Sequence, residues 1–340
     1  MQLLEAQSVT KVFGSGVLSK DRLVAVDEVS LVISEEKPTI VSIAGESGSG
    51  KTTLARLLLG MTQPSQGNIR FRGKDLGTMD RGERREFRRQ VQAIFQDPFE
   101  VYNPFYRIDQ VLTTPVRKFK LASSRQEEQR LIEDSLQMAG LRPGETLGRY
   151  PHQLSGGQRQ RIMVARALLL NPRIILADEP VSMVDASLRA TILESLMKLK
   201  RELGISLIYI THDLTTAYQI SKDIYILYRG AVAEVGSVER VIRDPQHPYT
   251  KLLVNSIPLP DPDIRWGGQA DMDQAPLVSS LKNAHGHGCK FANRCPYVMT
   301  ECREKQPPLY RTHEDRAVAC FLYKNEPSVG GREMAESLAA

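Results

Sequence analysis

One short run of residues in the sequence has the composition of a phosphate-binding loop. Its pattern is G-x-x-x-x-G-K-[ST], and its residues are Gly45, Glu46, Ser47, Gly48, Ser49, Gly50, Lys51 and Thr52. Glycines let the backbone curl so that its N–H groups face phosphate oxygens, and the start of a following helix attracts anions. We expect Lys51 to neutralise the β- and γ-phosphates and the Thr52 hydroxyl to bind Mg²⁺, and we place Thr53 in the same binding set.

Two acidic residues follow an apolar run further along the chain. Residues 174–177 are apolar, and Asp178 and Glu179 come directly after them. An unpaired carboxylate is costly to bury, so these side chains must point toward a polar partner. Near a phosphate loop, Asp178 can hold Mg²⁺ through its water shell, and Glu179 can orient or deprotonate an attacking water.

All four cysteines lie near the end of the sequence. They are Cys289, Cys295, Cys302 and Cys320. In a reducing compartment such clustering favours metal or cluster ligation over disulfides, although reduced and unligated thiols are the alternative. Four thiolates suit an iron–sulfur cluster or a tetrahedral zinc ion, and their spacing does not separate the two. We treat His285 and His287, which lie close by, as linker residues.

The elements that must position these residues can be read from the periodicity of the sequence. Residues 39–44 form an apolar strand that runs into the phosphate loop, and residues 51–59 have helical spacing up to Gly60. Short strands at residues 3–9, 23–33 and 69–71 flank this unit.

Strands and helices alternate through the rest of the chain. A helix over residues 187–203 lies between buried strands at 174–177 and 205–210, and residues 124–139 are also helical. This alternation predicts an α/β fold whose core sheet is mostly parallel and covered by helices.

The composition is that of a globular protein. The 340 residues are 41% hydrophobic and 25% charged. The longest apolar runs fall far short of the roughly 18 residues that span a bilayer, and no signal peptide begins the sequence, so we expect a cytosolic protein. The net charge of +5 is a mild excess and carries little weight for a nucleic-acid or membrane partner.

A third motif places the phosphate loop and the acids in a family. Leu154 is followed by Ser155, Gly156, Gly157 and Gln158 at the start of an amphipathic helix. With this signature, the sequence resembles the ATP-binding cassette (ABC) ATPases from about residue 3 to 255. The resemblance implies a fold of the P-loop type with an antiparallel β subdomain at the N-terminus and a helical signature subdomain. The Ser155 hydroxyl and the N–H groups of Gly156 and Gly157 would form a second anion site.

Further positions match the family one by one. Gln96 resembles the Q-loop glutamine that touches Mg²⁺ and water, and His212 resembles the switch histidine that contacts the γ-phosphate. Asp185 resembles the D-loop aspartate, although the preceding Ser-Met-Val departs from the family's usual Ala-Leu. Phe13 is the candidate to stack on adenine. The resemblance therefore implies an active ATPase that uses ATP and Mg²⁺, with Glu179 and His212 as catalytic residues.

The resemblance also implies partners. Two phosphate sites in one chain indicate two ABC ATPase subunits, identical or paralogous, that share two ATP molecules head to tail. Two membrane permease subunits would be driven through the Q-loop, and a substrate-binding protein outside the membrane would take part indirectly. The chain would lie peripherally on the cytoplasmic face of the cell membrane, without a nucleic-acid partner.

The end of the sequence resembles one subfamily. Residues 247–250, His-Pro-Tyr-Thr, and the cysteine spacing resemble those of oligopeptide and dipeptide importers, which implies a [4Fe–4S] cluster at the four cysteines. Some members of that subfamily transport oligosaccharides. A soluble ABC ATPase acting on ribosomes or DNA, or a regulator without enzymatic activity, are the alternatives. The sequence lacks the second cassette or the long coiled coil of the soluble classes, and the presence of Glu179 and His212 disfavours a regulator.

These motifs divide the chain into parts. We expect a nucleotide-binding domain at residues 1–255, with its helical subdomain at about 97–163, and a linker at 256–288. A small cysteine-rich domain is expected at 289–323 and a flexible C-terminus at 324–340.

Overall fold

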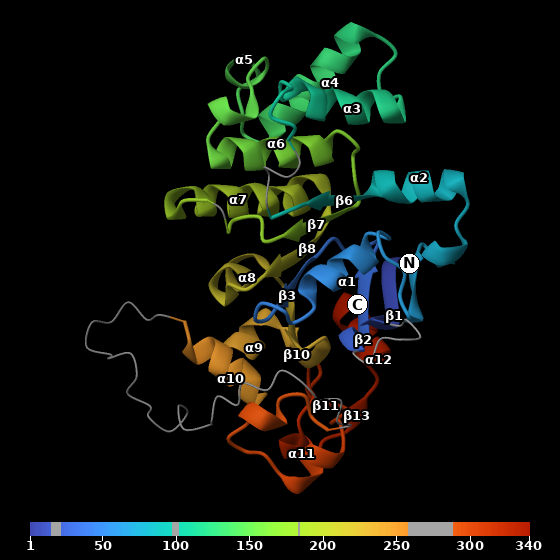
Figure 1. Cartoon of the computed structure of the whole chain (residues 1–340), viewed down its shortest axis with the longest axis vertical. Helices are drawn as coiled ribbons and strands as arrows, with labels where there is room; N and C mark the ends of the chain where they lie inside the picture. The colour runs from blue at the N-terminus through green and yellow to red at the C-terminus, as the bar shows by residue number, and fades with distance from the viewer. Residues whose placement is uncertain (15–21, 97–101, 183, 258–287) are drawn as a thin grey trace, which may run out of the picture.

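Two sheets with helices around them organise the described part of the chain (Figure 1). The structure is a computed structural model, and it describes residues 1–14, 22–96, 102–182, 184–257 and 288–340. A four-stranded antiparallel sheet has the strand order β2-β1-β4-β5. Its strands are β1 (Gln2–Phe13), β2 (Leu23–Ser34), β4 (Gln66–Phe71) and β5 (Lys74–Asp75).

The larger sheet has nine strands among the described residues, in the order β13-β11-β12-β10-β9-β3-β8-β7-β6. They are β3 (Ile40–Ala44), β6 (Val91–Ile94), β7 (Ile174–Asp178), β8 (Ser206–Thr211), β9 (Asp223–Tyr228), β10 (Ala231–Ser237), β11 (Leu309–His313), β12 (Arg316–Val318) and β13 (Ser328–Val329). The run from β9 to β6 is parallel, whereas the strands from β10 to β13 are antiparallel. The carboxyl ends of β3, β6, β7 and β8 therefore meet at one edge of the sheet.

Helices cover these sheets, and four of them gather at one end of the molecule. The helices are α1 (Lys51–Leu58), α2 (Arg81–Gln90), α3 (Asp109–Phe119), α4 (Arg125–Met138), α5 (Pro143–Thr146), α6 (Gly156–Leu168), α7 (Ala186–Leu203), α8 (Leu214–Ile220), α9 (Val238–Arg243), α10 (Pro248–Asn255), α11 (Thr300–Glu304) and α12 (Gly331–Ala339). Figure 1 shows α3 to α6 in a helical layer beyond α7. The expected bounds of the helical subdomain remain a prediction.

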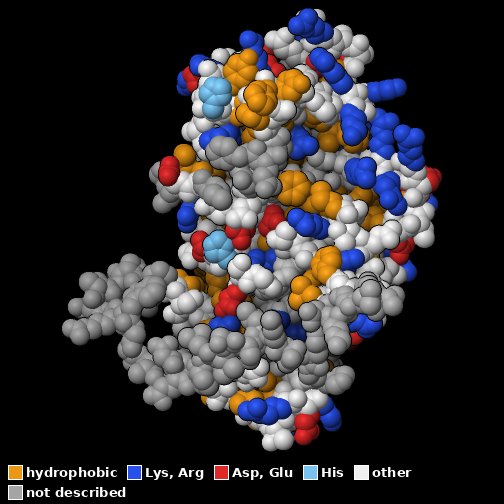
Figure 2. Space-filling view, in the orientation of Figure 1, with side chains coloured by type: hydrophobic (Ala, Val, Ile, Leu, Met, Phe, Trp, Pro, Cys, Tyr) orange, Lys and Arg blue, Asp and Glu red, His pale blue; other side chains and the backbone are white. Residues whose placement is uncertain are grey.

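The arginine-rich segment is a surface helix. Asp80 begins α2 with a capping box, in which its side chain accepts from the Glu83 N–H at 2.8 Å and the Glu83 carboxylate accepts from the Asp80 N–H at 2.9 Å. Only Phe87 of this helix is buried. Figure 2 shows Lys and Arg side chains gathered over α2 and the nearby end of α3.

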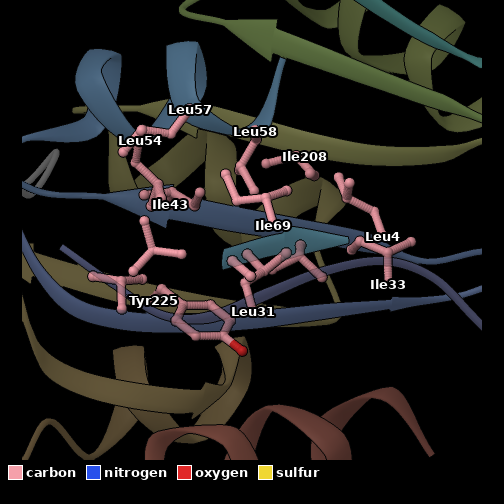
Figure 3. Packing of buried hydrophobic residues seen from close by; sticks show 14 of the residues in the cluster. Leu4, Leu31, Ile33, Ile43, Leu54, Leu57, Leu58, Ile69, Ile208 and Tyr225 are labelled. Carbon is pink, nitrogen blue, oxygen red and sulfur yellow. The ribbon is translucent and has the colours of Figure 1, made fainter. Parts of the chain in front are cut away.

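Helix α1 is fixed between the two sheets by apolar packing (Figure 3). Leu54, Leu57 and Leu58 of α1 pack in one buried cluster with Ile43 of β3 and with side chains from β1, β2 and β4. Each such leucine contributes about 1.5–3 kcal/mol when fully buried. Because α1 begins at Lys51, this packing also fixes the end of the phosphate loop.

The C-terminal part differs from the prediction. We expected residues 324–340 to be flexible, and this was wrong, because α12 packs on β2 and buries Met334, Ala335 and Leu338. We also expected the cysteine-rich segment to be a separate domain, but β12 pairs with β10 and extends the main sheet. Residues 258–287, which include most of the expected linker with His285 and His287, lie outside the described residues.

Candidate active site

The phosphate loop, residues 45–52, connects β3 to α1, as the sequence predicts. Gly50 has a φ of 102°, and a Cβ atom there would lie 2.2 Å from the Ala25 carbonyl oxygen. A Cβ atom on Gly45 would lie 2.3 Å from the Leu227 carbonyl oxygen. A side chain at either position would collide with backbone, so the loop can take this path only with glycine there.

Lys51 is buried and tied to the start of the loop. Its Nζ donates to the carbonyl oxygens of Gly45, at 2.7 Å, and Glu46, at 2.9 Å. Burial lowers the pKa of Lys51, while the carboxylates of Glu179, Asp178 and Glu46 act in the opposite direction. The ammonium group is thus held beside the loop and close to the two strand-end acids.

Asp178, the last residue of β7, carries a buried carboxyl group. Burial and then the neighbouring Glu179 raise the pKa of Asp178, against the opposing effect of Lys51 and Arg56. Two acids beside each other at a strand end favour a bound cation, because a cation offsets both the burial and the repulsion. With Thr52 in the first turn of α1, the oxygen ligands present fit Mg²⁺.

Three predicted residues meet at the carboxyl edge of the sheet. The Glu179 carboxylate accepts a hydrogen bond from Gln96 Nε2 at 3.0 Å, and its other oxygen lies 3.0 Å from His212 Nδ1. Gln96 follows β6 by two residues, because that strand ends at Ile94 rather than at the expected residue 95. A carboxylate held in this way, beside Lys51, can orient a water molecule and accept its proton.

The backbone of Glu179 is held in a conformation that is uncommon for residues other than glycine. Its φ is 46°, in the left-handed region. The Glu179 N–H donates to the Ile210 carbonyl oxygen at 2.9 Å, and the Ser182 hydroxyl donates to the Glu179 carbonyl oxygen at 2.9 Å. Strain of this kind persists only where surrounding contacts maintain it, and it is typical of active sites.

The signature motif begins α6. Ser155 accepts from the Gln158 N–H, and the Gln158 side chain accepts from the Ser155 N–H at 2.9 Å. A Cβ atom on Gly157 would lie 2.9 Å from Leu188 of α7, so the glycine permits close helix packing. Figure 1 places α6 on the far side of α7 from α1. Among the described residues, a single chain does not bring the signature to its own phosphate loop.

Two further predicted residues lie at element ends. Asp185 is exposed at the residue before α7. Phe13 ends β1 and is partly exposed, with Lys11 Nζ 5.3 Å from the centre of its ring. An exposed aromatic side chain is available for stacking, and the assignment of Phe13 to adenine stays a prediction.

All four cysteines line one small cavity, together with Phe291 and other apolar side chains. They are free thiols, and Cys302 and Cys320 are buried. Burial raises the pKa of Cys289 and Cys295, and raises that of Cys320 to about 11. Within the described ranges, no three His, Cys, Asp or Glu side chains are grouped so that they could hold a single metal ion. Ligation therefore stays a prediction.

The chain is similar to known proteins over most of its length. Residues 26–182 match the family described as ABC transporter, and residues 233–302 match the family described as oligopeptide/dipeptide transporter, C-terminal region. The putative oligopeptide transport ATP-binding protein YkfD of Bacillus subtilis is 38% identical over 325 residues, which are 96% of this chain and 97% of YkfD. The chain belongs to the ABC transporter family. It is an ATPase of that family, as the sequence predicts.

A second relative and a solved structure, both named as ATP-binding, are also similar to this chain. The oligopeptide transport ATP-binding protein OppF of Salmonella typhimurium is 39% identical, over 88% of each chain. A solved dimeric ATP-binding cassette in a post-hydrolysis state, bound to ADP and phosphate, is 31% identical with a TM-score of 0.61. That similarity covers 69% of this chain and 99% of the cassette. No helix in the described part of the chain has the length and apolar character needed to cross a membrane.

One contact to the phosphate loop was not predicted. The Tyr249 hydroxyl accepts a hydrogen bond from the Glu46 N–H at 2.8 Å. Tyr249 belongs to the His-Pro-Tyr-Thr motif, which in the sequence alone indicates only a subfamily. The Tyr249 side chain is buried and its hydroxyl needs a partner, but that burial is a property of the folded chain and gave no signal in the sequence.

Proposed function

We propose that this chain is the ATP-hydrolysing motor subunit of an importer that takes up peptides through a separate membrane permease. The observation that carries the proposal is the Glu179 carboxylate, which Gln96 and His212 hold at the strand ends beside Lys51 and Asp178. This arrangement suits a general base next to bound phosphate and Mg²⁺.

Each residue of the site then has a role. Lys51 and the N–H groups of the phosphate loop bind the β- and γ-phosphates, and Thr53 completes that set. Thr52, Gln96 and Asp178 bind Mg²⁺ directly or through water. Glu179 takes the proton of the attacking water, and His212 orients Glu179 and contacts the γ-phosphate. Phe13 stacks on the adenine.

The signature completes a site on a second chain. Ser155, Gly156, Gly157 and Gln158 lie away from the phosphate loop of their own chain, so an identical or paralogous subunit must bring its signature to it. Asp185 lies near that shared interface. Closure of such a pair on ATP would move two permease subunits from the cytoplasmic face of the membrane, and a binding protein would deliver the cargo from outside.

The C-terminal half supports peptides as the cargo. Residues 233–302 match the oligopeptide/dipeptide transporter C-terminal region, and YkfD and OppF are named for oligopeptide transport. An oligosaccharide is the competing cargo, and the uptake assay below separates the two.

The uptake of labelled cargo tests this function. Cells lacking the chain are complemented with wild type, with Glu179→Gln, or with the matched control Glu202→Gln on the exposed end of α7. We expect wild type and the control to restore uptake of a labelled tripeptide and Glu179→Gln not to. Uptake of a labelled oligosaccharide instead would overturn the peptide assignment, and co-purification of permease chains identifies the complex.

We further propose that the four cysteines ligate one [4Fe–4S] cluster. All four cysteines line the same cavity, and soft thiolates suit iron–sulfur chemistry. The cluster would stabilise a segment that has little apolar surface of its own.

Metal analysis tests the cluster. After anaerobic purification we expect about four irons per chain, with sulfide, in the wild type. Cys302→Ser is expected to lose them and part of its thermal stability while keeping at least part of its nucleotide binding. One zinc per chain would indicate a zinc site in place of the cluster. A protein that contains neither iron nor zinc would contradict ligation altogether.

A further inference from the structure

The segment between Cys289 and Cys295 contacts the phosphate loop directly. Arg294 Nη1 donates to one Glu46 carboxylate oxygen at 2.9 Å, and Nη2 donates to the other at 3.1 Å. Such a two-pronged ion pair fixes orientation as well as distance, because the planar guanidinium matches the carboxylate. The Glu46 carboxylate is the main reason that the pKa of Arg294 is raised.

A second cation of the same segment holds the other side of the loop. Lys290 Nζ lies 2.6 Å from an Asp27 carboxylate oxygen and donates to the Arg229 carbonyl oxygen at 3.0 Å. The next residue, Gly230, donates its N–H to the Ser49 carbonyl oxygen at 2.8 Å. Lys290 therefore supports the turn on which the middle of the phosphate loop rests.

Aromatic packing fixes the segment between these two cations. Phe291 is buried and contacts Tyr228 and Tyr249, with ring centres 5.2 Å and 5.6 Å apart. Tyr249 is the residue whose hydroxyl accepts from the Glu46 N–H. The Arg294 guanidinium lies 5.6 Å from the centre of the Phe291 ring. The C-terminal part of the chain thus holds Glu46 at two points: Tyr249 binds its backbone N–H, and Arg294 binds its carboxylate.

We infer that Arg294 and Lys290 are positioning residues of the nucleotide site, which makes the segment between the first two cysteines part of that site. The inference rests on the proposed role of residues 45–52 as the ATP phosphate loop. A glycine-rich loop loses conformational entropy when it curls around phosphate, so contacts that order it beforehand strengthen binding. The free energy of nucleotide binding therefore depends on residues that contact no nucleotide.

Equilibrium titration of the full-length chain with ATP and Mg²⁺ tests this inference. Arg294→Ala is expected to raise the ATP Kd about 3–10-fold, the range for one well-oriented but partly exposed ion pair. Glu46→Gln should raise it similarly, and the double variant should be no weaker than the worse single one. Arg294→Lys should recover part of the affinity. The matched control is Lys324→Ala, an exposed cation of the same C-terminal region.

The outcomes separate this inference from the proposed function. An ATP Kd for Arg294→Ala within about twofold of wild type would overturn the inference, and so would a lowered melting temperature without a change in Kd. Additive effects in the double variant would overturn the route through Glu46. Lys51→Ala tests the phosphate loop itself, and if that change left the Kd unaltered, the proposed function would fail first.

Discussion

Glu179 is the residue on which the proposed chemistry depends. One oxygen of its carboxylate accepts a hydrogen bond from Gln96 Nε2, and the other lies beside His212 Nδ1. These contacts keep the carboxylate in one orientation at the end of β7. A glutamine there would keep the shape of the side chain and lose the capacity to accept a proton. The substitution therefore separates nucleotide binding from hydrolysis.

We predict that Glu179→Gln keeps ATP binding and slows hydrolysis about 10²–10⁴-fold, or about 3–5 kcal/mol of barrier. Single-turnover hydrolysis with labelled ATP, measured with the subunits that the complex requires, is the check. Glu202→Gln serves as the control, because Glu202 is an exposed residue of α7. Turnover within a few-fold of wild type would remove Glu179 as the base.

At this scale, the sequence predicts residues that follow strands and fails for residues brought in from afar. Asp178, Glu179 and His212 stand at strand ends, where the sheet order brings them together. The partners of Glu46 are 203 and 248 positions away along the chain. Local spacing carries no information about such contacts, which depend on how the last third of the chain returns to the first.

A buried acidic side chain of β10 connects that strand to the residues just before α10 by hydrogen bonds. Glu234 of β10 is fully buried and accepts hydrogen bonds from the N–H groups of Gln246, at 3.1 Å, and His247, at 2.8 Å. Burial raises the pKa of Glu234 from 4.5 to about 7, against these bonds and the charge of Arg316 on β12. Near neutral pH the folded chain therefore holds a proton that the unfolded chain has released.

This difference makes stability depend on pH. Because the pKa of Glu234 is raised in the folded state, its contribution to the free energy of unfolding is complete below about pH 4.5. That contribution is lost as the pH rises through about 7. We predict that the unfolding free energy of Glu234→Gln, relative to that of wild type, rises by about 1–3 kcal/mol from pH 5 to pH 8. Urea unfolding at both values measures it, with the exposed Glu239→Gln as control. Equal differences at the two pH values would contradict the burial argument.

Helix α12 gives a second prediction about an element. Met334 is 1% exposed where α12 packs against the first sheet, so Met334→Ala should leave a cavity and cost about 2–4 kcal/mol of unfolding free energy. The control is Met138→Ala, because Met138 of α4 is half exposed. If α12 were dispensable, the two variants would unfold at the same denaturant concentration.

The central elements follow from periodicity, and the C-terminal ones do not. The parallel strands are apolar runs, and the helix between β7 and β8 is long enough for its apolar periodicity to be recognised in the sequence. Strands β12 and β13 have three and two residues, too few for an alternating pattern. β12 pairs with the free side of β10, and β13 pairs with β11 further out, so both pairings are properties of the assembled sheet.

The placement of the signature away from its own phosphate loop has a consequence for the whole molecule. We predict that Glu179→Gln, which binds ATP without consuming it, becomes dimeric in ATP and Mg²⁺, with itself or with a paralogous subunit. Light scattering measures the mass. A double variant that also carries Lys51→Ala should remain monomeric, because it binds the nucleotide poorly. Persistent monomers with every candidate partner would argue against shared sites.

The pairing of β12 with β10 has an implication for solubility. Without the C-terminal strands, β10 would present a row of unpaired N–H and C=O groups at the border of the nine-stranded sheet. Exposed edges of this kind recruit strands from other molecules, and native proteins blunt them with very short final strands. Here the border is β13, a strand of two residues. A chain cut after residue 257 would retain the residues of the phosphate loop but lose its contacts with Arg294, and it would be expected to aggregate through β10.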